Sequence, residues 1–494
     1  MFANDTWSLY VTTLLVIYAL VIIFFVVRGM MKTKDIKDFA IGSKGFPAWA
    51  VGLSLAASMT SAATFIINPG FIALYGFSGI ISFGIVMPIA IFTSLIFFTK
   101  AFQKYGATVK AVTMAQWIGK RYDSKAMTLF FAVLSLLLIT FIVLICVGLT
   151  QIISKSLNLE PFWVLLGLVV FVFGYMMFGG ANSMVYTNSI QALLMVIVAI
   201  MLLASGADYF TEGFDGFMAT LKNINPNLVK PTNEESFLFR DYFEIIFCQI
   251  IIGIAIVCQP HIITKTLFLK SEKSVNTYLL IAITAMILFF LVVIAGLYAR
   301  IVFPDLTLND VPLQMDELVS AYVVKTFTAG AGVIIVAGLI SAGLSTLENL
   351  IQSLSTTIST DLITPMFPAV KKISGVLLNK IVIVALAIAS FLLSYDQILH
   401  PNVSVAIFAQ NGVYAYFAAA FVPVLFGIYF KKVKKSAVFI ASFSAVALHF
   451  IIYYGRITPY MQEAVNNPGV SAAIAIVVSF LVANLLYLVS KKIE

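Results

Sequence analysis

The stretch Ala337-Gly-Leu-Ile-Ser-Ala-Gly-Leu-Ser-Thr-Leu-Glu-Asn-Leu350 lies in a long apolar segment, yet it is rich in small and polar residues. In a helix, one face would carry four of them at spacings of i, i+3, i+4 and i+7: Ala342, Ser345, Thr346 and Asn349. Glu348 lies beside that face. Polar groups inside an apolar segment are costly in lipid, so we expect them to face protein or a water-filled cavity. Oxygen ligands of this kind suit a hard cation such as sodium, and the stretch therefore predicts an ion-coupling site.

The composition excludes an ordinary soluble protein. Of the 494 residues, 61% are apolar and 11% are charged, and the mean hydropathy is +1.04, which is typical of a polytopic membrane protein. The net charge of +8 indicates membrane topology, and we expect no nucleic-acid partner. The three cysteines lie in apolar segments and the three histidines are scattered, so we expect no disulfide, no metal cluster and no enzyme active site.

The hydropathy pattern predicts thirteen transmembrane helices and an all-α fold, because a span needs about 20 apolar residues. The expected spans are 8–28, 48–75, 79–99, 126–154, 161–178, 187–206, 243–264, 276–302, 328–361, 376–395, 402–430, 436–454 and 470–490. No part of the sequence is polar over a length that would form a separate soluble domain. We therefore expect one membrane domain, 1–494.

The basic residues test this count, because cytoplasmic loops carry an excess of Lys and Arg. With the N-terminus outside, 23 of the 30 basic residues fall on the cytoplasmic side and 7 fall outside. Lys265 counts as cytoplasmic, and no Lys or Arg falls in the middle of a predicted span. We expect a multi-pass plasma-membrane protein with its N-terminus outside and its C-terminus in the cytoplasm. The short loops favour a bacterial inner membrane.

Three connecting segments have features of their own. The external segment 207–242 predicts a surface helix at Phe214–Leu221, and the external segment 303–320 is rich in acidic residues. Both are interpreted as solvated connectors, with an extracellular gate as the alternative. The basic segment 100–126 predicts a short amphipathic helix at the cytoplasmic surface.

The second and seventh spans carry signals of broken helices. Small and hydroxyl residues fill the second span from Gly52 to Thr64, and the Asn68-Pro-Gly70 triplet follows in its outer third. Unwinding there would free backbone carbonyls to bind an ion, although small residues also serve close helix packing. Gly253 and Pro260 can interrupt the seventh span. The two spans are five apart, as an inverted five-plus-five repeat requires.

A set of motifs, in order along the chain, carries a family resemblance. They are Phe39-Ala-Ile-Gly-Ser-Lys-Gly leading into Leu53-Ser-Leu-Ala-Ala-Ser-Met-Thr-Ser61, then Gln259-Pro-His-Ile, then Ser341-Ala-Gly-Leu-Ser-Thr followed by Ile358-Ser-Thr-Asp-Leu362. With these motifs the chain resembles the solute–sodium symporter family, and among its branches those for proline, pantothenate and acetate. Together with the topology, the resemblance covers essentially the whole chain.

The resemblance implies a leucine-transporter-like core with an inverted repeat. Residues 48–206 would form the first repeat and 243–430 the second, with 8–28 as a peripheral first helix and 436–490 as two peripheral helices. It also implies a sodium site between the second and ninth spans. The implied ligands are the backbone oxygens of Ala57, Thr60 and Ala342 and the hydroxyls of Ser345 and Thr346.

Asn188 departs from the family pattern, in which many members carry an aspartate that helps a second sodium site. Since Glu348 and Asn349 stand on the ninth span, the carboxylate could have moved across the same cavity. We hypothesise a second cation or proton site formed by Asn188, Glu348 and Asn349 together with Ser345. The alternative is that Glu348 is a buried hydrogen-bonding residue between helices.

Candidate solute contacts come from the middles of the second, fourth, seventh and eleventh spans. They are Thr64, Asn68, Thr140, Cys248, Gln249, Gln410, Asn411, Tyr414 and Tyr416. Each of these side chains could instead join two helices by a hydrogen bond. Phe141 stands where sialic-acid transporters place an arginine, which disfavours that substrate. His261 is expected at a cytoplasmic helix end, as a cap or a gate.

The sequence thus predicts a sodium-coupled symporter that imports a small polar solute, such as proline or a small monocarboxylate, by alternating access. Its partners would be the solute, sodium and the lipid bilayer, with no cofactor besides the coupling ion. A monomer would suffice for function, and the oligomeric state is left open. The alternatives are a proton-coupled, sugar or vitamin symporter of the same fold, or a channel, facilitator or transporter-like sensor.

Overall fold

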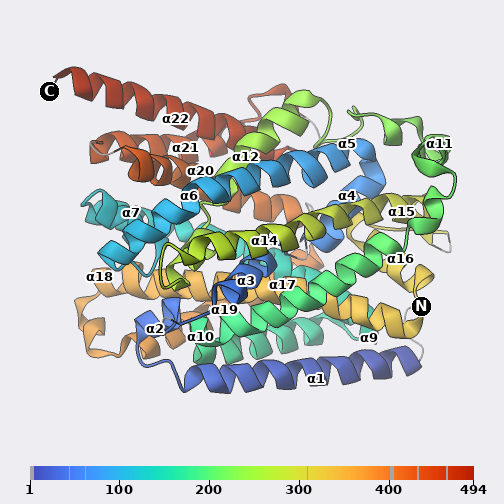
Figure 1. Cartoon of the computed structure of the whole chain (residues 1–494), viewed down its shortest axis with the longest axis horizontal. Coiled ribbons are helices and arrows are strands. Elements are labelled where there is room, and N and C mark those ends of the chain that lie inside the picture. The colour runs from blue at the N-terminus through green and yellow to red at the C-terminus, as the bar shows by residue number, and fades with distance from the viewer. Residues whose placement is uncertain are drawn as a thin grey trace.

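The computed structural model describes residues 5–43, 45–61, 63–308, 310–400, 405–430, 433–462 and 465–493. Most helices run side by side along the longest axis of the molecule (Figure 1). Helix α1 (Asp5–Met30) begins near one end of that axis, and α22 (Pro468–Ile493) ends near the other. Residues of the predicted features that lie outside the described ranges are Lys44, Ala62, Asn309, residues 402–404, Lys431 and Lys432.

In the described chain, ten helices are long and apolar enough to cross a membrane. They cover Leu9–Met30, Phe77–Val109, Lys125–Leu157, Pro161–Ala204, Ser274–Val302, Ala329–Met366, Gly375–Leu399, Val405–Tyr429, Lys435–Gly455 and Pro468–Lys491. Two further pairs of helices, Ala48–Met59 with Ala63–Tyr75 and Phe243–Ile256 with Pro260–Phe268, are bent by 56° and 55° at short breaks. If each bent pair is one span, the described chain has up to twelve.

The elements keep the labels of Figure 1. In the first half they are α2 (Ile36–Ile41), α3 (Ala48–Met59), α4 (Asn68–Tyr75), α5 (Phe77–Gly79), α6 (Met87–Val109), α7 (Met114–Arg121), α8 (Lys125–Leu134), α9 (Ile139–Leu157), α10 (Pro161–Ala204) and α11 (Gly213–Ile224). In the second half they are α12 (Gln249–Ile256), α13 (Pro260–Ile263), α14 (Ser274–Leu291), α15 (Ala295–Val302), β1 (Thr307–Leu308), β2 (Val311–Pro312), α16 (Leu318–Thr326), α17 (Ala329–Thr357), α18 (Thr364–Met366), α19 (Gly375–Leu399), α20 (Val405–Tyr429) and α21 (Lys435–Gly455).

Helix α10 is interrupted at Gly180. Its 44 residues would extend about 66 Å if straight, roughly twice the hydrocarbon core of a membrane. Gly180 has φ 54° and ψ −156°, a backbone conformation open almost only to glycine. A Cβ at this position would lie 2.8 Å from the carbonyl oxygen of Phe39. The break therefore divides α10 into limbs 161–179 and 181–204, where the sequence predicts two spans.

The second span breaks earlier than the Asn68-Pro-Gly70 triplet. Helix α3 ends at Met59, and Thr60 is extended with φ −108° and ψ 91°. After the break a π-helical turn, Ala63–Ile67, leads into α4. The triplet itself continues the helix, because a proline in the first helical turn needs no N–H partner. The break therefore lies among the small and hydroxyl residues of the span, with Thr60 and Ser61 outside the helix, and not at the triplet.

The seventh span is longer than predicted, and its break lies in its middle. Helix α12 ends at Ile256, α13 begins at Pro260, and a 3₁₀ turn then runs from Thr264 to Phe268. Gln259 caps α13 in an extended conformation, so the Gln259-Pro-His-Ile motif is central rather than at the inner end of the span. The predicted end at Thr264 was wrong because Leu267 and Phe268 continue the buried segment beyond Lys265.

The connecting segments pack on the helices more closely than solvated connectors would. The predicted surface helix at Phe214–Leu221 is confirmed as α11. Further along the same segment, Phe239 packs on Phe83 with ring centroids 5.0 Å apart. The predicted amphipathic helix is confirmed as α7, but its Trp117 is fully buried and stacks on Phe102 at 4.5 Å.

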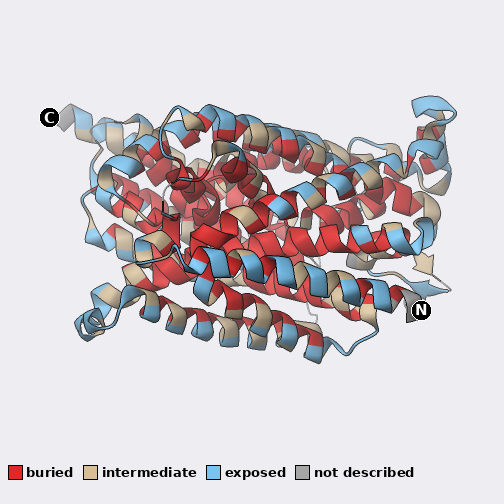
Figure 2. Ribbon diagram, turned by 60° about the horizontal axis from the view of Figure 1, so that its bottom comes forward, coloured by how far each residue is buried: buried red, intermediate tan, exposed pale blue. Residues whose placement is uncertain are grey.

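Burial increases from the outer helices to the centre (Figure 2). The outer helices α1, α19 and α22 expose large apolar side chains, as a lipid-facing surface requires, including Leu20, Leu392 and Leu488. Helix α17 lies at the centre and is buried almost throughout between Gly332 and Thr357. The polar stretch Ala337–Leu350 is therefore in the interior of the molecule.

The break in α10 gives a testable prediction about stability. Gly180→Ala should destabilise the protein by about 1–3 kcal/mol, because alanine rarely adopts this backbone conformation and its Cβ would strike Phe39. Gly174→Ala is the matched control, since a Cβ there meets nothing within 4 Å. Thermal unfolding of the two purified variants in detergent measures the difference. Equal melting temperatures for both variants and the wild type would contradict this account.

Candidate ion and solute site

The break after α3 and the polar face of α17 bring four oxygen atoms together. The Ser345 hydroxyl donates to the backbone oxygen of Ala57 at 2.8 Å and to that of Ala342 at 3.0 Å. The Thr346 hydroxyl lies 3.3 Å from the Ala342 oxygen and 3.4 Å from that of Ser58. Because α3 ends at Met59, the carbonyls of its last turn lack partners within their own helix. The four oxygens, from Ala57, Ala342, Ser345 and Thr346, have the hard-ligand chemistry that suits sodium.

Thr60, the fifth predicted sodium ligand, lies at the break itself. Its hydroxyl donates to the carbonyl of Ala56 at 2.5 Å. The hydrogen bonds of the described residues do not join its backbone oxygen to the other four. Thr60 is three residues after Ala57 in the sequence. Its backbone is extended, and it lies just beyond the end of α3.

Glu348 is held by α10 through three hydrogen bonds. Tyr175 and Gln191 donate to its Oε1 at 2.7 and 3.1 Å, and Thr187 donates to its Oε2 at 2.8 Å. The side chain is fully buried. These contacts are those of the alternative interpretation, a hydrogen-bonding residue between helices.

The other members of the hypothesised second cation site have different partners. Asn188 donates from Nδ2 to the Ser54 hydroxyl at 3.2 Å, and Asn349 donates to the backbone oxygen of Ser345. The Oδ1 atoms of Asn188 and Asn349 are buried and have no hydrogen-bond partner among the described residues. Among the described residues, no hydrogen bond therefore joins Asn188 to Glu348 or to Asn349.

Lys265 is a buried cation that the sequence predictions missed. The residue is 1% exposed, and its Nζ donates to the Ser54 hydroxyl at 2.5 Å. The prediction that Lys265 is a cytoplasmic loop residue, with no Lys or Arg inside a span, was therefore wrong. The signal in the sequence was weak, because a lysine near the end of an apolar segment is ordinarily counted with the following loop.

A cavity of about 110 Å³ lies beside the oxygen cluster. Four predicted solute contacts line it: Thr64, Asn68, Gln410 and Tyr414. Its other polar lining residues were not predicted as contacts: Ser58, Ser61, Gln259 and His261. The described lining contains no Lys, Arg, Asp or Glu. Hydroxyl, amide and imidazole groups can therefore bind a polar solute by hydrogen bonds without a fixed charge.

His261 differs from its predicted place at a cytoplasmic helix end. It is 3% exposed, and its ring lies 6.3 Å from that of Phe141, which also lines the cavity. Its Nδ1 has no partner among the described residues. The cause is the central break at Pro260, which brings the Gln259-Pro-His-Ile motif to the cavity.

Five predicted solute contacts lie outside the lining of this cavity. Thr140 donates to the backbone oxygens of Leu137 and Ala409, as hydroxyls in helices commonly do. Asn411 donates from Nδ2 to Tyr454, and its Oδ1 accepts from Nε2 of His449. Tyr416 packs against Phe131, whereas Cys248 and Gln249 are buried nearer the start of the seventh span.

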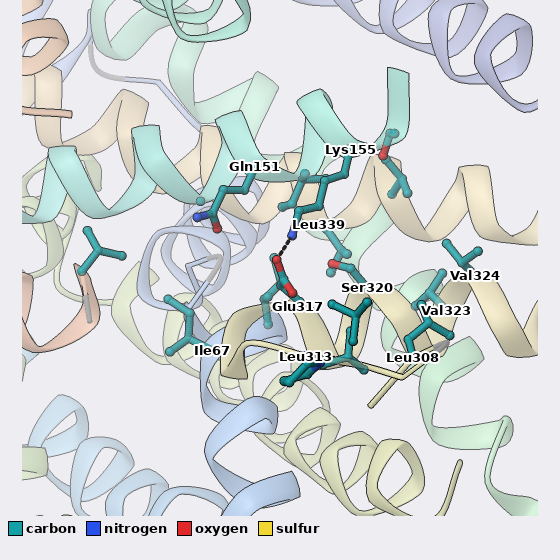
Figure 3. A pocket seen from close by; sticks show the side chains of 18 of the residues that line it. Ile67, Gln151, Lys155, Leu308, Leu313, Glu317, Ser320, Val323, Val324 and Leu339 are labelled. Carbon is teal, nitrogen blue, oxygen red and sulfur yellow. Dashed lines mark hydrogen bonds and ion pairs between the residues drawn. The ribbon is translucent and has the colours of Figure 1, made fainter. Parts of the chain in front are cut away.

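A second cavity of about 340 Å³, here called the vestibule, adjoins the central cavity, and Ile67 and Leu144 line both. An ion pair joins Lys155 of α9 to Glu317 of the segment 303–320 across the vestibule (Figure 3). The short hairpin of β1 and β2, which precedes Glu317 in the chain, lies at its edge. This geometry supports the gate alternative for the acidic segment over a simple solvated connector.

The sequence model of the sodium:solute symporter family matches residues 39–444. The chain belongs to the sodium:solute symporter family. It is 27% identical over 492 residues to the sodium/pantothenate symporter of Escherichia coli, with 95% of each chain covered. It is 24% identical to the human sodium/myo-inositol cotransporter 2 over 76% of this chain and 60% of that protein.

The fold is shared with a solved symporter structure. A Na⁺-coupled sialic acid symporter in a substrate-bound outward-open state matches with a TM-score of 0.75 at 17% identity, covering 96% of this chain and 98% of the other. This sodium:solute symporter is therefore a multi-pass membrane protein that couples sodium to the transport of a small solute, and it is a transporter rather than an enzyme. The family resemblance recognised from the motifs is confirmed.

The hydrogen bonds to Glu348 give a prediction for this symporter. Tyr175→Phe should lower the free energy of unfolding by about 1.5–3 kcal/mol, because it removes one donor from a buried carboxylate. Tyr395→Phe is the control, since the ring of Tyr395 packs on Phe162 and Phe391 away from Glu348. Thermal unfolding at one fixed sodium concentration measures both variants. A melting temperature for Tyr175→Phe as high as that of Tyr395→Phe would contradict the proposed hydrogen bond.

Proposed function

We propose that this protein imports a small polar organic solute together with sodium by alternating access. The observation that carries the proposal is the joining of the oxygen cluster to the cavity through Ser58. The backbone oxygen of Ser58 accepts from Thr346, and Ser58 also lines the cavity. A sodium ion on the cluster would hold the broken end of α3 against α17 and thereby shape the solute site.

The coupling follows from this shared residue. Sodium that fixes the end of α3 would raise the affinity for solute, and by linkage solute raises the affinity for sodium by the same factor. An inward step of one positive charge across 100 mV supplies roughly 2.3 kcal/mol, which corresponds to almost fiftyfold accumulation. Substrate and ion would then close the outer vestibule, where Lys155 and Glu317 meet, before release on the other side.

The arrangement of the helices supports thirteen spans. Counting the two limbs of α10 separately adds one span to the twelve that include the bent pairs. An odd number of spans would place the start of α1 and the end of α22 on opposite sides of the membrane. This agrees with their positions near opposite ends of the molecule (Figure 1). In this arrangement the inverted repeats are 48–206 and 243–430, the N-terminus is outside, and the membrane is a bacterial inner membrane.

The lining of the cavity favours a solute with several hydrogen-bonding groups. Pantothenate, named for the E. coli relative, is the first candidate, because it combines hydroxyls, an amide and one carboxylate. Gln259, Gln410 and Asn68 offer amide groups, and Thr64 and Tyr414 offer hydroxyls. Proline and small monocarboxylates are the next candidates, since an amide can donate to a carboxylate.

Uptake by the purified protein in vesicles tests the proposal. An inward sodium gradient should drive labelled pantothenate, proline or a small monocarboxylate above its equilibrium concentration, and dissipation of the gradient should abolish the accumulation. A panel that includes myo-inositol and glucose identifies other solutes by competition. Uptake that never exceeds equilibrium for any of these solutes would indicate a facilitator and would contradict the proposed coupling.

Thr346 provides a direct test of the sodium ligands. Thr346→Val should raise the sodium concentration for half-maximal uptake at least about tenfold, because it removes a hydroxyl from the oxygen cluster. Thr346→Ser retains the hydroxyl and should stay within about threefold of the wild type. The sodium dependence of uptake, or of thermal stability, measures both variants. An unchanged sodium dependence in the valine variant would remove Thr346 from the site.

A further inference from the structure

His261 is a buried imidazole whose Nδ1 lacks a hydrogen-bond partner. The residue is 3% exposed, and Nδ1 meets no donor or acceptor among the described residues. His449, which is also buried, shows the contrast: its Nε2 lies 2.9 Å from Oδ1 of Asn411, and its Nδ1 lies 3.1 Å from the Ser471 hydroxyl. Buried polar groups are nearly always paired in folded proteins, so a ligand is the missing partner that His261 indicates.

Gln259 has the same feature on the other side of Pro260. It is 2% exposed, and its Oε1 has no partner among the described residues. Gln259 caps α13 in an extended conformation, and His261 lies in the first turn of that helix. Both residues line the central cavity. The break of the seventh span therefore brings two unpartnered polar atoms to one cavity.

A hydroxyl group of the solute fits these two atoms better than a charged group does. The described lining holds no Lys, Arg, Asp or Glu, so a charged group would be buried there without an opposite charge. A carboxylate only accepts hydrogen bonds and therefore cannot pair with Oε1 of Gln259. A hydroxyl can donate to that oxygen, and it can pair with Nδ1 of His261 in either imidazole tautomer, because it both donates and accepts.

We propose that His261 is a specificity-determining residue of this symporter, which binds a hydroxyl group of the solute together with Gln259. The inference rests on the proposed function and adds the substrate class, small solutes that carry a hydroxyl. A solute without one would leave both buried atoms unpaired, and sites built to bond a hydroxyl reject such analogues. Pantothenate and hydroxylated monocarboxylates therefore rank above proline and acetate.

The test measures equilibrium binding to the purified full-length protein at saturating sodium, with two pairs of matched solutes. The pairs are pantothenate with its 2,4-dideoxy analogue, and lactate with propionate. In each pair that binds, the wild type should bind the hydroxylated member at least about tenfold more tightly. His261→Phe should reduce that ratio to within about threefold of one, because the phenyl ring offers no hydrogen bond to the hydroxyl.

Two further variants separate recognition from a structural role. His261→Gln restores a side chain that donates and accepts, so it should recover most of the preference for the hydroxylated member. His400→Phe is the matched control, because this histidine is exposed, and it should keep the wild-type ratio. A purely structural loss would weaken both members of a pair alike and leave their ratio unchanged.

The outcomes separate this inference from the proposed function. Equal affinity of the wild type for both members of each pair would overturn the inference and leave sodium coupling intact. A folded His261→Phe variant with the wild-type ratio would overturn it as well. If that variant does not fold, Gln259→Leu decides, and an unchanged ratio there overturns the inference. Sodium-driven uptake of a solute without a hydroxyl, with no binding of pantothenate or lactate, would also overturn the inference alone. The absence of any sodium-driven uptake would overturn the proposed function too.

Discussion

The hydrogen bond from the Ser345 hydroxyl to the backbone oxygen of Ala57 joins the two elements on which the site depends. A helix that breaks inside a membrane leaves carbonyls without partners, and lipid offers no water to satisfy them. Here the break at the end of α3 lies against the polar face of α17, whose hydroxyls supply the missing donors. A sodium ion can take the place of those hydroxyl protons, because rotation of the hydroxyls turns the donors into ligands.

Helix α17 can supply donors to the carbonyls at the break because the surrounding helices pack closely around it. A Cβ at Gly338 would lie 2.3 Å from a side-chain carbon of Val198, and one at Gly343 would lie 2.6 Å from Leu149. Small residues therefore set the distance between α17 and its neighbours on α10 and α9. The close approach lets Tyr175, Thr187 and Gln191 reach Glu348, so the same helix carries the proposed sodium ligands and a buried carboxylate.

The sequence predicted most of the helices and the polar face of α17, because both depend on patterns within single segments. Hydropathy located the long apolar helices and the surface helix α11, and the spacing of Ser345 and Thr346 placed both hydroxyls on one face. The solute contacts were harder to predict, because a polar residue in a buried helix can point in several directions. Thr64 and Tyr414 point to the cavity, whereas Thr140 and Asn411 satisfy hydrogen bonds elsewhere.

The sequence predicted breaks in the second and seventh spans, but their positions and consequences could not be predicted from local pattern alone. Pro260 indicates an interruption, but its place in the middle of the span depends on the buried turn beyond it, Thr264–Phe268. That turn moves His261 from a helix end to the cavity and brings Lys265 into the interior. Lys265 is buried there with its Nζ on the hydroxyl of Ser54, which also accepts from Asn188, a tertiary arrangement with no signal in the sequence around the lysine.

The position of the coupling ion tests the central claim most directly. Crystals of the protein grown with thallium in place of sodium would show the ion by its anomalous scattering. The account predicts one peak between the broken end of α3 and α17, within coordination distance of Ala57, Ala342, Ser345 and Thr346. A thallium peak elsewhere in the membrane region, with these four oxygens left free of the ion, would contradict it.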